Sequence, residues 1–118
     1  MDDAITLRQN IEAKIQQLEK QRLRLFKAAQ FKAQKIAEYD KAISLTMLKL
    51  KNGVITEFEG EKIDGVTATT VEKIARGLCW NEALKKEEGE SLYKSLLTNI
   101  DCIRAELNGL QSINKFFE

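Results

Sequence analysis

The sequence predicts an all-α protein: an antiparallel two-helix coiled-coil hairpin whose apex carries a short helix and either a small β-hairpin or an irregular loop. Apolar residues recur at alternating three- and four-residue spacing in two long segments, which puts a narrow apolar stripe, here called the seam, on one side of each helix. Glycines punctuate the segment between them, and proline is absent from all 118 residues. Two seams joined by a chain reversal can bury each other, so one helical-hairpin domain is expected over residues 1–118.

The first long helix is expected over residues 4–51, where good helix formers dominate and no glycine intrudes. Asn52-Gly53 then supplies a C-terminal cap, because glycine adopts the left-handed conformation at little cost. The predicted seam of this helix consists of Ile11, Ile15, Leu18, Leu25, Ala29, Ile36, Tyr39, Ile43 and Leu50.

The apical connection is expected over residues 52–80. Val54–Val66 fits a short hairpin or an irregular loop equally well, since apolar runs this short do not decide between them. Thr69 and Glu72 have the spacing of a capping box, so a short helix is expected from Thr69 to Arg76, ended by Gly77.

The second long helix is expected over residues 81–117. Gly109 lies between two leucines of its seam, so we expect a close approach of the two long helices there. Gly89 marks either a weak point or another close approach, and the sequence leaves that open. The seam residues of this helix are Leu96, Ile100, Ile103, Leu107, Leu110 and Phe117.

Charge is distributed unevenly along the chain. Residues 1–56 hold eleven Lys or Arg and six Asp or Glu (net +5), whereas residues 57–118 hold eight and twelve (net −4). The stretch from Lys20 to Ala37 contains six cations and no acid, with Phe26 and Phe31 interleaved. Such a face can follow a phosphate backbone, and its candidate nucleic-acid contacts are Lys20, Arg24, Lys27 and Lys35.

The same cations can instead serve the fold itself or bind an acidic protein partner. Within the fold or an oligomer, acids on the second helix can pair with them, and the residues available are Glu82, Glu87, Glu88, Glu90, Asp101 and Glu106. The sequence leaves the choice among these three roles open.

The apex holds more apolar residues than a simple connection needs. They form either a small satellite core under the loop or an exposed binding patch for a protein partner. In the second case the candidate partner-binding residues are Phe58, Ile63 and Trp80.

A homo-oligomer is also expected. The second helix is shorter than the first, so the N-terminal turns of the first helix overhang, and an uncovered seam favours association with another chain. The candidate seam residues for this contact are Ile11, Ile15 and Leu18.

Signals for catalysis are poor, and we expect no enzyme, no cofactor and no metal. Without histidine, neither a Ser-His-Asp nor a Cys-His arrangement can exist in this chain. Cys79 and Cys102 are too far apart for a CxxC motif; Cys102 is expected to be buried beside Ile103, and Cys79 to be partly exposed. With no signal peptide and no stretch able to span a bilayer, a cytoplasmic location and no contact with membranes are expected.

Three segments carry a resemblance: Ala105–Lys115 (AELNGLQSINK), Asp64–Thr69 (DGVTAT) and Ala75–Gly77 (ARG). Together they resemble small uncharacterised helical proteins of phages and prophages of Gram-positive bacteria. The resemblance covers the C-terminal half and implies an accessory role in the host cytoplasm, near replication, recombination or defence, without naming functional residues. The two-helix architecture also looks like a prefoldin subunit, although the short apical helix departs from that pattern.

The sequence therefore predicts a non-enzymatic accessory or inhibitor protein that binds a protein partner. The alternative is an accessory nucleic-acid-binding protein that uses the basic face of the first helix. A purely structural oligomer or a prefoldin-like chaperone is the third hypothesis.

Overall fold

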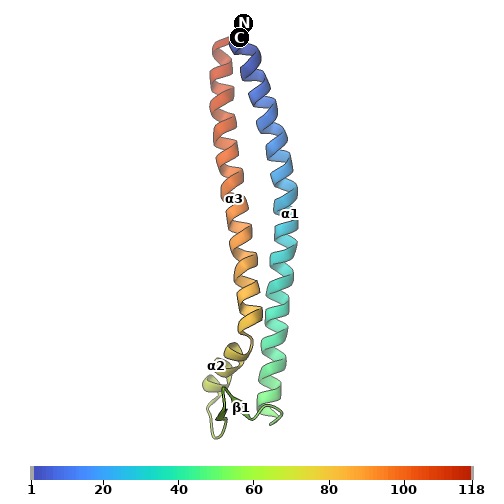
Figure 1. The fold of residues 1–118 in the computed structure, drawn as a ribbon, viewed down its shortest axis with the longest axis vertical. Coiled ribbons are helices and arrows are strands. Elements are labelled where there is room, and N and C mark those ends of the chain that lie inside the picture. Colours follow the sequence, from blue (N-terminus) through green and yellow to red (C-terminus); the bar gives the residue numbers. More distant parts are fainter. Residues whose placement is uncertain (1, 118) are drawn as a thin grey trace. The chain divides into compact units, whose positions relative to one another are not determined.

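The computed structural model describes residues 2–117, which fold almost entirely as helix (Figure 1). The all-α prediction is confirmed, and the long helices begin and end within three residues of the predicted bounds. In chain order the elements are α1 (Asp2–Lys51), β1 (Glu57–Phe58), β2 (Glu61–Lys62), α2 (Ala68–Leu78), α3 (Trp80–Asn114) and the 3-10 turn η1 (Lys115–Phe117).

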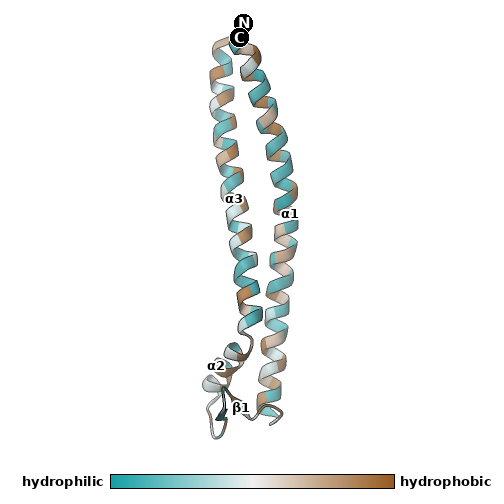
Figure 2. Cartoon of the chain, viewed as in Figure 1, coloured by the Kyte–Doolittle hydropathy of each residue, from teal (hydrophilic) through white to brown (hydrophobic). Residues whose placement is uncertain are grey.

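The chain divides into two compact units, to which α1 and α3 both contribute. Unit 1 combines Met1–Gln30 with Ser91–Glu118, and unit 2 is Phe31–Glu90. Apolar and polar residues alternate along both long helices (Figure 2), as expected for helices that bury only one side.

The C-terminus of α1 is capped where the sequence predicts it. Gly53 has a φ of 72°, a conformation that glycine adopts without steric cost. The amide of Gly53 donates to the carbonyl of Leu50 and that of Val54 to the carbonyl of Lys49, at 3.3 and 2.9 Å. These two bonds make a Schellman motif, which satisfies carbonyls that the end of the helix would leave free.

A small β-hairpin follows, which decides between the two predicted forms of this segment. β1 and β2 pair antiparallel, with Glu57 opposite Lys62 and Phe58 opposite Glu61. The two turn residues, Glu59 and Gly60, both have positive φ, at 51° and 79°. A two-residue turn of this kind has the twist that joins two antiparallel strands directly.

α2 begins and ends differently from the prediction. Its N-cap is Thr67, whose hydroxyl accepts a hydrogen bond from the amide of Thr70 at 3.3 Å. The predicted capping box at Thr69 is therefore wrong, because Thr67 offers the same chemistry two residues earlier. Glu72 instead pairs with Arg76 one turn along the helix, at 2.7 Å.

Gly77 does not end α2, which is a second correction. The helix continues through Gly77 to Leu78. A Cβ at Gly77 would lie 2.7 Å from the ring of Phe58, so the missing side chain makes room for that ring. Gly77 therefore allows the β-hairpin, through Phe58, to pack closely against α2.

In unit 1, α1 packs against α3 through a small apolar cluster. Leu18, Ile100 and Ile103 are buried together, and Leu25 and Leu107 pack against them. Lys14 of α1 also forms an ion pair with Glu106 of α3. All five apolar residues of this cluster belong to the predicted seams; Leu50, another seam residue, is buried elsewhere, in unit 2.

Two seam residues lie outside the buried stripe. Ile15 is exposed at 39%, and Phe117 at 51%. At the N-terminal end of α1 the stripe runs instead through Ala4, Leu7, Ile11, Lys14, Leu18 and Gln21. Lys14 takes the place predicted for Ile15 because its ammonium reaches Glu106 across the helix pair.

In unit 2, α1 and α3 come close together at Gly89. A Cβ on Gly89 would lie 3.3 Å from the backbone Cα of Lys32 and 3.4 Å from the ring of Phe31. Around Gly109, in contrast, a Cβ would find no atom within 4 Å. The close approach predicted at Gly109 is therefore wrong. The two helices approach closely at Gly89 instead, where the sequence had left the role of the glycine open.

The two cysteines have the opposite environments from those predicted. Cys79, at the junction of α2 and α3, is buried, and its Sγ lies 3.3 Å from the hydroxyl of Thr46 in α1. Cys102 is exposed. Ile103 next to it faces the cluster, and consecutive helical residues point in different directions, so Cys102 is turned outward.

The two helical glycines give a matched pair of stability predictions. Gly109→Ala is expected to raise the free energy of unfolding by about 1 kcal/mol, because alanine is the better helix former and meets nothing there. Gly89→Ala is expected to lower it, because the new Cβ would press on the backbone of Lys32, which cannot yield as a flexible side chain would. Urea titration followed by circular dichroism measures both; equal shifts in the same direction would contradict this packing.

Gln21 gives another prediction, because it is a polar side chain inside the stripe of unit 1. It is only 7% exposed, and its Oε1 has no hydrogen-bond partner among the described residues. Gln21→Leu removes this unsatisfied acceptor and is expected to raise the free energy of unfolding by about 1 kcal/mol. The exposed Gln16→Leu serves as control in the same urea titration, and a destabilised Gln21→Leu variant would contradict the prediction.

Candidate interaction surfaces

The start of α3 presents two large apolar side chains to solvent. Trp80, the first residue of the helix, is 65% exposed, and Leu84, one turn later, is half exposed. Residues four apart lie on one side of a helix. Trp80 and Leu84 therefore form an apolar surface in unit 2, here called the Trp80 face.

The other two apical candidates have a different environment. The ring of Phe58 occupies the space that Gly77 leaves, and the Phe58 residue is half-buried. Ile63 is also half-buried, and its amide donates to the carbonyl of Thr56 at 2.8 Å, beside the hairpin. The apex thus combines the two alternatives: a satellite core that contains Phe58 and Ile63, and an exposed surface at Trp80. Sequence reasoning missed Leu84, although its i+4 spacing from Trp80 was a usable signal.

Three of the four basic candidates lie together in unit 1. Lys20, Arg24 and Lys27 are exposed and follow one another at four- and three-residue spacing, so they share one side of α1. Among the described residues, no acidic group lies within ion-pair distance of these three side chains. Leu23 and Phe26, between them in the sequence, are exposed as well.

Lys35 differs from these three. Its side chain is 18% exposed, and its ammonium lies 3.1 Å from the carboxylate of Glu38 and 5.3 Å from the centroid of the Phe31 ring. The hydrogen bond from Lys35 is the largest of the effects that lower the pKa of Glu38, and the amide of Gln34 adds a second bond in the same direction. The ammonium group of Lys35 therefore already has interaction partners within unit 2.

The described ion pairs do not match Lys20, Arg24, Lys27 or Lys35 with acids of the second helix. Lys14 pairs with Glu106 across α1 and α3, outside the stretch from Lys20 to Ala37, and the carboxylate that pairs with Lys35 belongs to α1 itself. Lys20, Arg24 and Lys27 are thus exposed cations that solvent or a partner outside this chain can contact.

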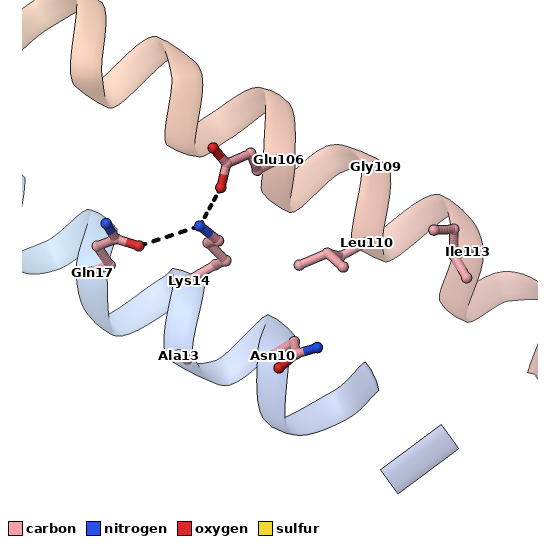
Figure 3. A pocket seen from close by; sticks show the side chains of 8 residues that line it. All are labelled: Asn10, Ala13, Lys14, Gln17, Glu106, Gly109, Leu110 and Ile113. Carbon is pink, nitrogen blue, oxygen red and sulfur yellow. Dashed lines mark hydrogen bonds and ion pairs between the residues drawn. The ribbon is translucent and has the colours of Figure 1, made fainter. Parts of the chain in front are cut away.

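A groove lies between α1 and α3 in unit 1 (Figure 3), with a volume of about 560 Å³. Ala13 and Gly109, with small or absent side chains, line it, together with Leu110 and Ile113. Its charged lining residues, Lys14 and Glu106, pair with each other, and Lys14 also donates to Gln17. The groove thus combines apolar residues and the polar Asn10 and Gln17 with one balanced ion pair. Sequence reasoning singled out Gly109 but missed the groove, because Ala13 belongs to no motif.

The residues predicted to be an uncovered oligomer seam are largely covered by the chain itself. Leu18 is buried in the apolar cluster, Ile11 is half-buried, and Leu7, in the turns expected to overhang, is buried too. The overhang is wrong because α3 does not have to cover the other end of α1: Thr46 already contacts the junction of α2 and α3. Ile15 is the one of the three candidates that is exposed.

Groups suited to metal binding do not gather in the described part of the chain, where no three Cys, Asp or Glu residues lie close enough to share an ion. Within residues 2–117, no helix has the length and the apolar character needed to cross a membrane. Comparison with protein-family models, with curated proteins and with solved structures finds no match. The case for a function therefore has to come from the surfaces described above.

Proposed function

We propose that this protein is a non-enzymatic accessory protein that docks on a protein partner through the Trp80 face. The observation that supports the proposal is the exposure of Trp80, at 65%, at the first residue of a helix. Tryptophan dominates many protein interfaces, because its large rigid ring buries much apolar area at little cost in conformational entropy. In the same unit the Phe58 ring packs against Gly77, whereas Trp80 is largely exposed, which favours docking as the role of the Trp80 ring.

Three further features belong to the same proposal. The contacts of α1 support an antiparallel coiled-coil hairpin, since Lys32 meets Gly89 of α3 and the later Thr46 meets the earlier Cys79, just before α3. The chain acts as a homo-oligomer in the cytoplasm. If the resemblance to phage proteins reflects origin, the partner is a replication, recombination or defence protein of the host.

Trp80→Ala is expected to abolish partner capture while leaving the helix content unchanged, because Trp80 is 65% exposed. Phe58→Ala is expected to lower stability instead, since it empties the space beside Gly77. Affinity capture from host lysate, scored by whether the same protein is retained by wild type and lost by Trp80→Ala, tests the first point. Leu23→Ala, an equally exposed apolar position in unit 1, is the matched control.

Trp80 also provides a direct readout, because it is the only tryptophan of the chain. Its emission in the free protein is expected to be that of a water-exposed indole and to be quenched readily by iodide. Addition of the captured partner should shift the emission to shorter wavelength and protect it from iodide. An emission already shielded in the free protein, or one unchanged by the partner, would contradict docking at Trp80.

The second candidate function is nucleic-acid binding through Lys20, Arg24 and Lys27. The observation that favours it is that these three exposed cations share one side of α1 and have no ion-pair partner within the described chain. A purely structural oligomer or a prefoldin-like chaperone remains the third proposal, with no specific surface in its favour.

Fluorescence anisotropy of labelled single- and double-stranded oligonucleotides tests this second function. Three phosphate contacts predict a slope of about −2.7 for log affinity against log salt on duplex DNA. Arg24→Glu and Lys27→Glu are expected to abolish binding, whereas Lys35→Glu should have little effect, because Lys35 is held by Glu38. Absence of binding at low salt, or equal sensitivity at all three positions, would contradict the use of this face.

A further inference from the structure

Gly109 lacks a reason for being glycine within its own chain. It lies inside α3, where glycine weakens a helix relative to alanine. A side chain there would meet nothing, so packing between α1 and α3 does not require the glycine. Gly109 on α3 and Ala13 on α1 both line the groove.

An uncovered aromatic side chain lies on the same side of the same segment. Phe116, in η1, is 89% exposed, and Ile113, between it and Gly109, is 50% exposed and lines the groove. Gly109, Ile113 and Phe116 follow one another at four- and three-residue spacing, which places them along one face. Gly109, which lines the groove, and Phe116, whose ring could fill such a groove, are thus seven residues apart.

We propose that the groove between Ala13 and Gly109 receives Phe116 of a second copy of this chain, in a two-fold symmetric dimer. When the C-terminal ends of two α3 helices pack antiparallel about an axis near Ser112 and Ile113, position 109 of each copy faces position 116 of the other. Both grooves are then filled by one self-complementary contact, which is the form that a two-fold interface takes. The inference rests on the self-association part of the proposed function and is independent of Trp80.

Charge and area both fit a second copy. The charged groove residues, Lys14 and Glu106, neutralise each other, so two identical surfaces meet without repulsion. An aromatic side chain buries about 150–250 Å². Covering Phe116, Ile113 and the groove in both copies therefore buries roughly 1,000 Å² in total, the lower limit for a specific interface. The dimer is accordingly expected to dissociate in the micromolar range.

Sedimentation equilibrium of the full chain, from low to high micromolar concentration, tests the proposal. Wild type is expected to pass from monomer to dimer. Gly109→Leu places a side chain at the groove, where its Cβ meets no atom of the chain within 4 Å, and Phe116→Ser removes the ring; each should raise the dissociation constant of the dimer about tenfold or more. Leu23→Ser, which removes an exposed apolar side chain elsewhere in unit 1, should dimerise like wild type. Circular dichroism verifies that each variant keeps its helix content.

Disulfide cross-linking tests the symmetry, in a Cys102→Ser background that removes the exposed native thiol. Ile113→Cys lies next to the proposed axis and should cross-link rapidly at dimer-forming concentrations. Leu92→Cys, exposed on α3 but about six turns from the axis, should not.

Any one of four results would overturn the proposal. The wild type could stay monomeric, or Gly109→Leu and Phe116→Ser could dimerise as the wild type does. The control Leu23→Ser could lose dimerisation to the same extent as these variants, or position 92 could cross-link faster than position 113. The test of the dimer is independent of the test of docking at Trp80. Trp80→Ala should dimerise normally, and Gly109→Leu should still capture the protein partner.

Discussion

The rest of this structure depends on the burial of one narrow stripe between α1 and α3, because two neighbouring helices offer each other no wider surface. In unit 1 the stripe is buried at Leu18, Ile100 and Ile103, but it also contains Lys14 and the unsatisfied amide of Gln21. Among the described residues, no large side chain is shielded completely. Stability therefore comes from a thin contact, and most of each helix surface remains available to other molecules.

The two glycines of α3 show how that contact is adjusted. At Gly89 the missing side chain lets the backbone of α1 approach closely, and at Gly109 it leaves a groove. Glycine lowers the stability of a helix relative to alanine at both positions. Contacts within the chain explain the glycine at Gly89 but not the one at Gly109. A glycine without an internal reason is informative, because it points to something that occupies the space.

The exposed apolar residues have a similar meaning. Single exposed apolar side chains are ordinary on a protein surface, but Trp80 with Leu84 and Phe116 with Ile113 are pairs on one helix face. The packed residues next to them, Phe58 in one unit and Leu107 in the other, show that the chain can cover aromatic and aliphatic groups where the fold needs them. Both pairs leave apolar surface uncovered on the part of the chain that the structure describes.

The sequence by itself determined the two long helices and the capped end of α1, because these depend on local interactions; both ends of α2 differed from the prediction. The 3-4 spacing identified Leu18, Ile100 and Ile103 as buried, and Asn52-Gly53 identified the cap of α1, since propensity and capping act within a few residues. Only the tertiary structure decided which glycine permits a close approach, which cysteine is buried, and that Phe58 is half-buried while Trp80 is largely exposed. Each of these depends on which residue of one helix lies opposite which residue of another. A shift of one position, such as that from Ile15 to Lys14, changes the answer without changing any local pattern.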